Sequence, residues 1–338
     1  MAAYFEVEQL SVSFSTYFGR RQVLSLDNLC VEKGQAYGLV GESGSGKSVL
    51  GLAIMNLLAS PPADLHGDIT LDEVHLLALS QEEMRRVRGK RISMIFQDPM
   101  SSLNPVFTVA DQMMRVIRNK GGVSKTQARN IARETIELVE LPDPDNILAK
   151  YPHQLSGGQR QRIIIAIALS CGADFLIADE PTRNLDVTIQ AGILKLLANL
   201  RRDLGVTVLF IANNLGLVSA VCDRVGILLD GRIVETGSVR EVVRQPVHPY
   251  TTMLLRAIPK HKREAVEVEL PPDGSYELGD VPGCGFISRC ANRIEACRNG
   301  RPELRSVGGT HLVACGKPWR GGDEHAVTTA GERSPTRA

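Results

Sequence analysis

The sequence predicts an α/β protein built around a parallel β-sheet that binds a phosphate group. Short apolar runs alternate with helix-like segments, as in residues 35–41 (QAYGLVG), 175–181 (FLIADEP) and 205–214 (GVTVLFIANN). This alternation is typical of parallel strands joined by crossover helices. The first run leads directly into a glycine-rich segment that ends in Lys47 and Ser48, which is the context of a phosphate-binding loop.

Length and composition indicate a globular protein with a sizeable core. The chain has 338 residues, of which 43% are hydrophobic and 23% charged, and its net charge is +1. Such a balance gives no broad attraction to nucleic acid or anionic lipid. No run approaches the ~18 apolar residues that span a bilayer, and the acidic start MAAYFEVEQL does not resemble a signal peptide. We therefore expect a cytosolic chain that does not bind nucleic acid.

The elements follow one another in a clear order. Residues 5–40 are predicted to form strands, because YFEVEQLSVSF alternates in polarity. The segment after Lys47, VLGLAIMNLL, is apolar on nearly every side and predicts a buried helix. Between about 80 and 160 the pattern is helical, and Ser124 with Gln127 fits a capping box.

The composition changes after Pro259, and this change sets the domain boundaries. We expect a nucleotide-binding domain at 1–258 that contains a helical subdomain at about 98–165. A charged, turn-rich linker is predicted at 259–280 and a region with four cysteines at 281–318. The last segment, 319–338, has too little apolar content to fold alone and is predicted to be disordered.

The glycine-rich segment has the pattern Gly41-x4-Gly46-Lys47-Ser48. Its glycines let backbone N–H groups turn towards phosphate oxygens, and the following helix adds a favourable dipole. Lys47 would bridge the β- and γ-phosphates of ATP, and the Ser48 hydroxyl would bind Mg²⁺. The predicted ATP-binding residues are Gly41, Ser43, Gly44, Gly46, Lys47, Ser48 and Val49.

Two acidic residues, Asp179 and Glu180, end the apolar run FLIAD. A carboxylate at the C-terminal edge of a parallel strand beside a phosphate loop is placed to hold the Mg²⁺ shell. A second carboxylate can orient and deprotonate the attacking water. Alone, such a pair is more often a helix cap or a solvated turn, but the phosphate loop favours Asp179 as an ATP-site residue and Glu180 as a catalytic one.

Four segments together resemble the ATP-binding-cassette (ABC) ATPases over residues 5–235. They are QLSGGQRQR at 154–162, MIFQDP with Gln97, FLIADEPTRNLD, and DVTIQ starting at Asp186. The resemblance implies an ABC-type P-loop ATPase fold with a RecA-like parallel-sheet core, an antiparallel β subdomain and a helical signature subdomain. It also implies that Gln97 contacts Mg²⁺ and responds to the γ-phosphate, and that Asp186 contacts a second cassette.

In that family two cassettes sandwich ATP head to tail. By resemblance, the signature residues of this chain would cap the γ-phosphate of a nucleotide held by the partner; these residues are Ser156, Gly157, Gly158 and Gln159. Hydroxyl and glycine N–H groups are suitable donors to an anion. Phe18 occupies the position of the family's adenine-stacking aromatic, with Tyr17 as the alternative, although either ring could instead pack in the core or in a hairpin.

The C-terminal third resembles the peptide and nickel importer branch of the family. VHPYTTMLLRAIP at 247–259, SSLNP at 101–105 and the cysteine-bearing tail carry this resemblance. It implies a peripheral subunit at the cytoplasmic face of the plasma membrane, with a second ABC ATPase subunit and two transmembrane permease subunits as partners. An extracytoplasmic substrate-binding protein would deliver the cargo, so dipeptides, oligopeptides and nickel all fit this chain.

The tail has the spacing Cys284-x5-Cys290-x6-Cys297-x17-Cys315. Four thiolates can close a tetrahedral Zn²⁺ site or hold a [4Fe–4S] cluster, and the spacing lacks the paired CxxC of common zinc ribbons. Since this importer branch carries a [4Fe–4S] cluster in its tail, the resemblance favours the cluster over Zn²⁺ or free thiols. The expected role is structural.

The chain departs from the family's pattern at the switch position and in the segment after Glu180. The family has a switch histidine where this chain has Asn213, and Arg183 and Asn184 stand where small or hydroxylated residues are usual. An amide donates a hydrogen bond but cannot be protonated. We therefore expect a heterodimer with one degenerate ATP site, in which the ATP on this chain's own loop hydrolyses slowly. The alternative is that asparagine suffices because Glu180 carries the essential role.

Three rival functions remain at this point. A non-transport ABC ATPase of the DNA-repair kind would carry long insertions and a basic face, which the sequence lacks. An ATP-gated regulatory module with a metal-sensing tail would not need an intact Glu180. An exporter subunit is disfavoured by the tail.

Overall fold

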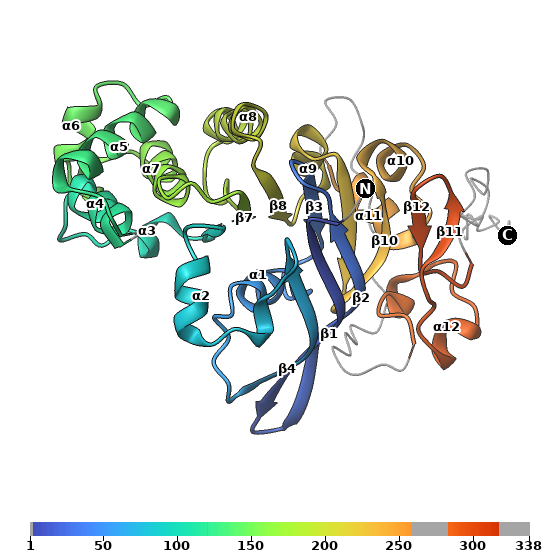
Figure 1. The fold of residues 1–338 in the computed structure, drawn as a ribbon. Coiled ribbons are helices and arrows are strands. Elements are labelled where there is room, and N and C mark those ends of the chain that lie inside the picture. Colours follow the sequence, from blue (N-terminus) through green and yellow to red (C-terminus); the bar gives the residue numbers. More distant parts are fainter. Residues whose placement is uncertain (1–2, 120, 259–282, 318–338) are drawn as a thin grey trace, which may run out of the picture.

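The computed structural model describes residues 3–119, 121–258 and 283–317. Figure 1 shows two sheets at the centre, a group of helices on one side and the C-terminal elements on the other. The predicted linker at 259–280 and the tail at 319–338 lie outside the described residues. No helix within those described ranges is long and apolar enough to cross a bilayer.

A mixed main sheet forms the centre of the molecule. Within the described residues it has eight strands in the order β11-β12-β10-β9-β3-β8-β7-β6. Its parallel strands are β3 (Ala36–Val40), β6 (Ile92–Ile95), β7 (Phe175–Asp179), β8 (Thr207–Ala212) and β9 (Arg224–Leu229). Beside them, β10 (Arg232–Ser238) runs antiparallel to β9. The predicted parallel-sheet core is therefore confirmed.

The register of three parallel strands determines where the site lies. Val40 of β3 is opposite Ala212 of β8, and Asp179 of β7 is opposite Ile211 of β8. The strands thus end level with one another, and all residues of β3, β7 and β8 are buried. The segments that follow them leave the sheet at the same edge, which is where ligands bind in such sheets.

A smaller antiparallel sheet packs across the main one, and the described part of it has four strands in the order β2-β1-β4-β5. The strands are β1 (Phe5–Thr16), β2 (Gly19–Val31), β4 (Ala63–Leu71) and β5 (Val74–His75). Helix α1 (Lys47–Ile54) is buried with both sheets in one hydrophobic cluster. Phe5 stacks on Phe175 at 4.6 Å between ring centroids, so the two sheets share a core.

The helical group lies to one side of the sheets (Figure 1). It follows the short elements η1 (Leu76–Ala78) and α2 (Gln81–Val87) and comprises α3 (Pro99–Ser102), α4 (Val109–Asn119), α5 (Lys125–Leu138), α6 (Pro144–Ala149), η2 (Pro152–Gln154) and α7 (Gly157–Leu169). The predicted capping box is confirmed, because the Ser124 side chain accepts a hydrogen bond from the Gln127 N–H. Four further helices follow, α8 (Val187–Leu204), α9 (Leu215–Val221), α10 (Val239–Arg244) and α11 (Pro249–Arg256), and the main hydrophobic cluster includes residues of each.

The cysteine region extends the main sheet. Its elements are η3 (Ile287–Arg289), α12 (Ala296–Asn299), β11 (Arg305–Gly308) and β12 (His311–Val313), and β12 pairs antiparallel with β10. Glu235 of β10 is fully buried; its carboxylate accepts hydrogen bonds from the N–H groups of Val247 and His248 and lies 2.7 Å from the His311 ring nitrogen. A buried carboxylate with this many partners ties β12 and the start of α11 to the sheet.

Candidate nucleotide site

The phosphate loop, residues 41–48, connects β3 to α1 at the common strand edge. The Lys47 ammonium lies inside the loop and donates hydrogen bonds to the carbonyl oxygens of Gly41 and Glu42, each at 2.8 Å. Burial lowers the pKa of Lys47, and the nearby carboxylates of Glu180 and Asp179 oppose that shift. A cation held in this concave loop is placed to meet phosphate oxygens.

The loop's path requires glycine at two positions in particular. A Cβ added to Gly41 would lie 2.2 Å from the Leu228 carbonyl oxygen, so no other residue fits without backbone movement. Gly46 has φ +104°, which only glycine adopts without strain, and it starts α1. The glycines therefore allow both the close approach to the sheet and the turn into the helix.

Asp179, the last residue of β7, is buried beside this loop. Burial raises the pKa of its carboxyl group, and a side-chain hydrogen bond with Ser48 opposes the shift. Among the described residues, Asp179 Oδ1 has no hydrogen-bond partner. A buried, unpaired carboxylate oxygen is costly, and a hard cation beside the Ser48 hydroxyl is the ligand that such a group suits. The residues present therefore fit Mg²⁺.

Glu180 follows directly and points to the same edge. Its Oε2 accepts hydrogen bonds from Gln97 Nε2 at 2.9 Å and from Arg183 Nη1 at 3.2 Å. Its φ of +43° is unusual for a residue with a side chain, and such strain is found at functional sites. The structure thus brings together Gln97 and Glu180, two of the predicted site residues, and adds a contact from Arg183 that the sequence does not predict.

Asn213 follows β8 and is exposed. Together with Glu180 and Arg183 it lines a cleft of about 220 Å³. Its neighbour Asn214 has a structural role, because its side chain caps α9 by accepting a hydrogen bond from the Gly216 N–H at 2.8 Å. Only the first of the two asparagines therefore faces the candidate reaction site.

The signature segment forms the start of α7. Ser156 accepts a hydrogen bond from the Gln159 N–H, and the Gln159 side chain accepts one from the Ser156 N–H. A Cβ on Gly158 would lie 2.8 Å from the Ile189 side chain, so α7 and α8 pack closely there. Asp186 caps α8 by accepting from the Ile189 N–H at 2.9 Å. The role of these residues against a partner's nucleotide stays a prediction.

The two candidate adenine-stacking aromatics lie at the turn between β1 and β2. Tyr17 is 97% exposed and Phe18 96% exposed, and their rings meet edge to face at 5.4 Å. The alternative that either ring packs in the core is therefore wrong, whereas a hairpin contact between them is present. Stacking of adenine on Phe18 stays a prediction.

The four cysteines of the C-terminal region line one small cavity. Burial raises the pKa of the thiols of Cys284 and Cys290, and that of Cys315 to about 11, and therefore favours their neutral form. All seven cysteines lie in the described residues and none forms a disulfide. No group of three or more Cys, His, Asp or Glu side chains in those residues is arranged around a single metal ion.

Sequence reasoning missed two residues that contact the phosphate loop. Tyr250 Oη accepts a hydrogen bond from the Glu42 N–H at 2.8 Å, and Arg289 forms an ion pair with the Glu42 carboxylate. Both are more than 200 positions away along the chain. No local pattern signals such contacts, since they depend on how the C-terminal region folds back.

Comparison with known proteins agrees with this geometry. A family model described as ABC transporter matches residues 24–183, and one described as the oligopeptide/dipeptide transporter C-terminal region matches residues 234–297. A probable peptide ABC transporter ATP-binding protein of Sinorhizobium fredii is 44% identical, with 87% of this chain and 88% of that protein covered. The chain belongs to the ABC transporter family.

Two further relatives and a solved structure of another protein are similar to this ABC ATPase. The dipeptide transport ATP-binding protein DppD of Bacillus subtilis is 43% identical over 91% of this chain and 93% of its own length. The oligopeptide transport ATP-binding protein OppD of Salmonella typhimurium is 41% identical over 93% of each chain. A dimeric ATP-binding cassette bound to ADP and phosphate superimposes with a TM-score of 0.62 at 26% identity, covering 70% of this chain and 99% of that one. The predicted ABC-type fold is confirmed, and the protein is an ATPase that uses ATP and Mg²⁺.

Proposed function

We propose that this ABC ATPase energises peptide import as one half of a heterodimer with one slow ATP site. The relatives are peptide, dipeptide and oligopeptide transport ATP-binding proteins, and the match to the C-terminal region of such transporters supports the same branch. Its partners would be a second ATPase and two permeases at the cytoplasmic face of the membrane. A substrate-binding protein on the other side would deliver the peptide.

The proposed chemistry follows from the strand edge. Lys47 and the loop N–H groups bind the phosphates, while Ser48, Asp179 and Gln97 would hold Mg²⁺, which neutralises charge on the phosphate oxygens. Glu180 accepts the proton of the attacking water. Because ATP binds the closed pair of cassettes more tightly than the open pair, binding shifts the population towards closure, and hydrolysis reverses that shift.

The observation that carries the slow-site proposal is the surroundings of Glu180. Arg183 donates a hydrogen bond to the carboxylate oxygen that also accepts from Gln97, so a water that Glu180 orients must compete with a guanidinium. Asn213 lines the same cleft and cannot carry a proton to or from the phosphate. The chain thus has the groups that bind phosphate, whereas Arg183 and Asn213 each weaken the activation of the attacking water.

Restoring the histidine tests this proposal. In a heterodimer whose partner lacks its own catalytic glutamate, Asn213→His should raise the single-turnover rate of the ATP on this chain's loop by about 10²-fold, because a general acid–base or charge-stabilising contact returns. The rate is measured by rapid quench.

Adding Glu180→Gln to Asn213→His should abolish the gain, which shows that the gain passes through this site. An unchanged rate in Asn213→His would contradict the slow-site proposal and favour the view that Glu180 alone carries hydrolysis.

Peptide uptake tests the transport role. In membrane vesicles that contain both permeases and both ATPases, a peptide-loaded binding protein should stimulate ATP hydrolysis and labelled peptide should accumulate. Lys47→Ala should abolish accumulation, because the loop loses the cation that meets the phosphates. Lys90→Ala, a change at an exposed lysine outside the phosphate loop, serves as the control and should leave accumulation unchanged. Hydrolysis without peptide stimulation, or accumulation of nickel alone, would contradict peptide import.

We also propose that the four C-terminal thiols hold a [4Fe–4S] cluster with a structural role. All four line one cavity, and their spacing lacks the paired CxxC of common zinc ribbons. Four thiolates can hold a [4Fe–4S] cluster, in which each binds a different iron. The shared cavity and the spacing are what support this proposal.

Metal and sulfide content tests the cluster. Protein purified without oxygen should contain about four iron atoms and four acid-labile sulfides per chain and absorb visible light. Cys290→Ser should lower both contents, because a ligand is lost. Cys30→Ser, a change at an exposed thiol on β2, should leave them unchanged. Zinc without sulfide would contradict the cluster.

A further inference from the structure

The C-terminal cysteine region contacts the phosphate loop directly. Arg289, the residue before Cys290, donates two hydrogen bonds to Glu42, from Nη1 to Oε1 and from Nη2 to Oε2, each at 2.8 Å. This is a bidentate pair, the strongest geometry for an arginine and a carboxylate. Glu42 is the second residue of the phosphate loop, so the pair joins the loop to a region 247 positions away.

Every polar group of Glu42 is engaged. Its N–H donates to Tyr250 Oη, its carbonyl accepts from the Lys47 ammonium, and its carboxylate pairs with Arg289, all at 2.8 Å. The orientation of this peptide determines where the Lys47 ammonium sits. The carboxylate also acts on Lys47 electrostatically, since Glu42 is among the charges that oppose the fall in the Lys47 pKa.

Arg289 is itself held in place by aromatic rings. Its guanidinium carbon lies 5.1 Å from the centre of the Phe286 ring and 6.0 Å from that of Tyr250, which is cation–π distance. Tyr250 is fully buried and Phe286 nearly so. The arginine thus bridges α11, the cysteine region and the loop, with only 22% of its side chain exposed.

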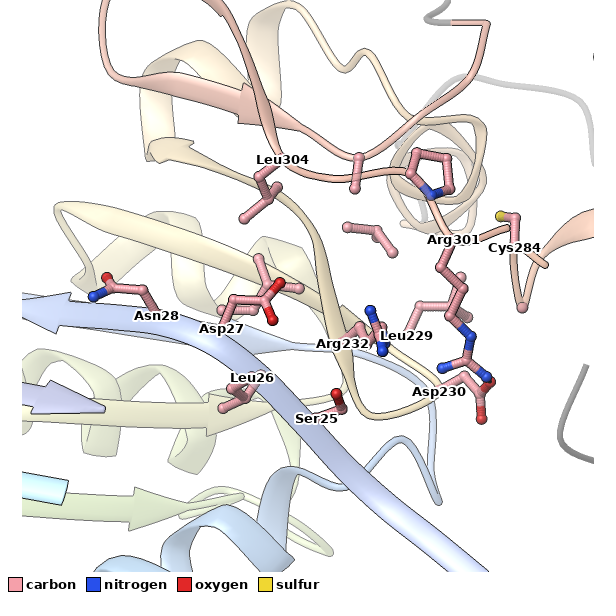
Figure 2. A pocket seen from close by; sticks show the side chains of 15 residues that line it. Ser25, Leu26, Asp27, Asn28, Leu229, Asp230, Arg232, Cys284, Arg301 and Leu304 are labelled. Atoms are coloured by element: carbon pink, nitrogen blue, oxygen red, sulfur yellow. The ribbon is translucent and has the colours of Figure 1, made fainter. Parts of the chain in front are cut away.

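A second contact links the cysteine region to the phosphate loop through the turn between β9 and β10. Arg301 donates to Asp230 in the turn between β9 and β10, at 3.1 Å, and the two side chains lie together beside Cys284 in Figure 2. The next residue, Gly231, donates its N–H to the Ser45 carbonyl of the phosphate loop at 3.0 Å. The cysteine region therefore reaches the loop by a direct route and by a route through this turn.

A carboxylate in a loop that binds ATP needs neutralisation. Glu42 carries a negative charge within a few residues of the groups that meet three phosphates, and like charges in a partly buried site repel. Arg289 cancels that charge and fixes the side chain that carries it. Without Arg289, the same carboxylate would oppose ATP binding and would be free to turn towards Lys47.

We propose that Arg289 is a positioning residue of the ATP site, which makes the cysteine region a functional part of that site. Arg289 acts through Glu42, by neutralising its charge and by holding the loop peptide that places Lys47. The inference rests on ATP binding at the loop, which family membership establishes, and not on the identity of the cargo or of the metal. If the assembled transporter binds ATP but imports no peptide, the proposed transport role is overturned and this inference still stands.

A double-mutant cycle on the full chain tests it. Arg289→Met should raise the dissociation constant for ATP about tenfold at low salt. The increase should be smaller at high salt, because salt screens the repulsion between the Glu42 carboxylate and the phosphates. The Glu42→Gln variant is the reference for the second arm, because it removes both the repelling charge and the ion pair. Adding Arg289→Met to Glu42→Gln should change the ATP dissociation constant by less than about threefold, because Arg289 then has no carboxylate to neutralise or hold. Arg289→Lys keeps the positive charge but loses the bidentate geometry, so its dissociation constant for ATP should lie between those of the unchanged protein and Arg289→Met.

Arg298→Met is the matched control. It removes an exposed arginine from the same region and should leave ATP affinity unchanged. Hydrogen exchange of residues 41–48 should become faster in Arg289→Met and remain unchanged in Arg298→Met. The inference is overturned if Arg289→Met binds ATP as tightly as the unchanged protein, or if Arg289→Met weakens ATP binding as much in the Glu42→Gln background as in the unchanged protein.

Discussion

The parallel register of β3, β7 and β8 is the constraint on which the site depends. Because these strands end level, the phosphate loop, the acidic pair and Asn213 leave the sheet at one edge. The edge carries local costs, since Asp179 Oδ1 is buried without a partner among the described residues and Glu180 adopts a left-handed backbone. Such costs persist where the surrounding structure enforces them and a ligand relieves them. The buried sheet supplies that enforcement.

Binding and hydrolysis depend on different parts of this edge. The loop and Asp179 are arranged for phosphate and a cation, whereas Glu180 shares its carboxylate with Arg183 and has an amide as its neighbour across the cleft. Under the slow-site proposal, ATP would stay bound on this chain's loop for longer than on the partner's loop. In the proposed heterodimer, that would keep two cassettes associated while the other composite site, with the proposed cap from this chain's Ser156, completes hydrolysis.

Sequence patterns predicted those features that depend on residues close together in the chain. The loop glycines, the capping box at Ser124 and the acids at the end of β7 each depend on neighbours within a few residues. Contacts between distant segments were not predictable. Arg289 lies 247 positions from Glu42, with which it pairs, and the three-residue strand β12 is too short to show a pattern before it pairs with β10. The exposure of Phe18 likewise depends on the hairpin, not on its own chemistry.

The central claim is that the two ATP sites of the assembled transporter differ in hydrolysis because of this chain's own residues. The most direct test is single-turnover hydrolysis in the unmodified heterodimer. The protein is loaded with two ATP molecules, and hydrolysis is followed by rapid quench. The account predicts two phases of equal amplitude, a fast one from the partner's loop and a slow one from this chain's loop. A single phase that consumes all bound ATP at one rate would contradict it.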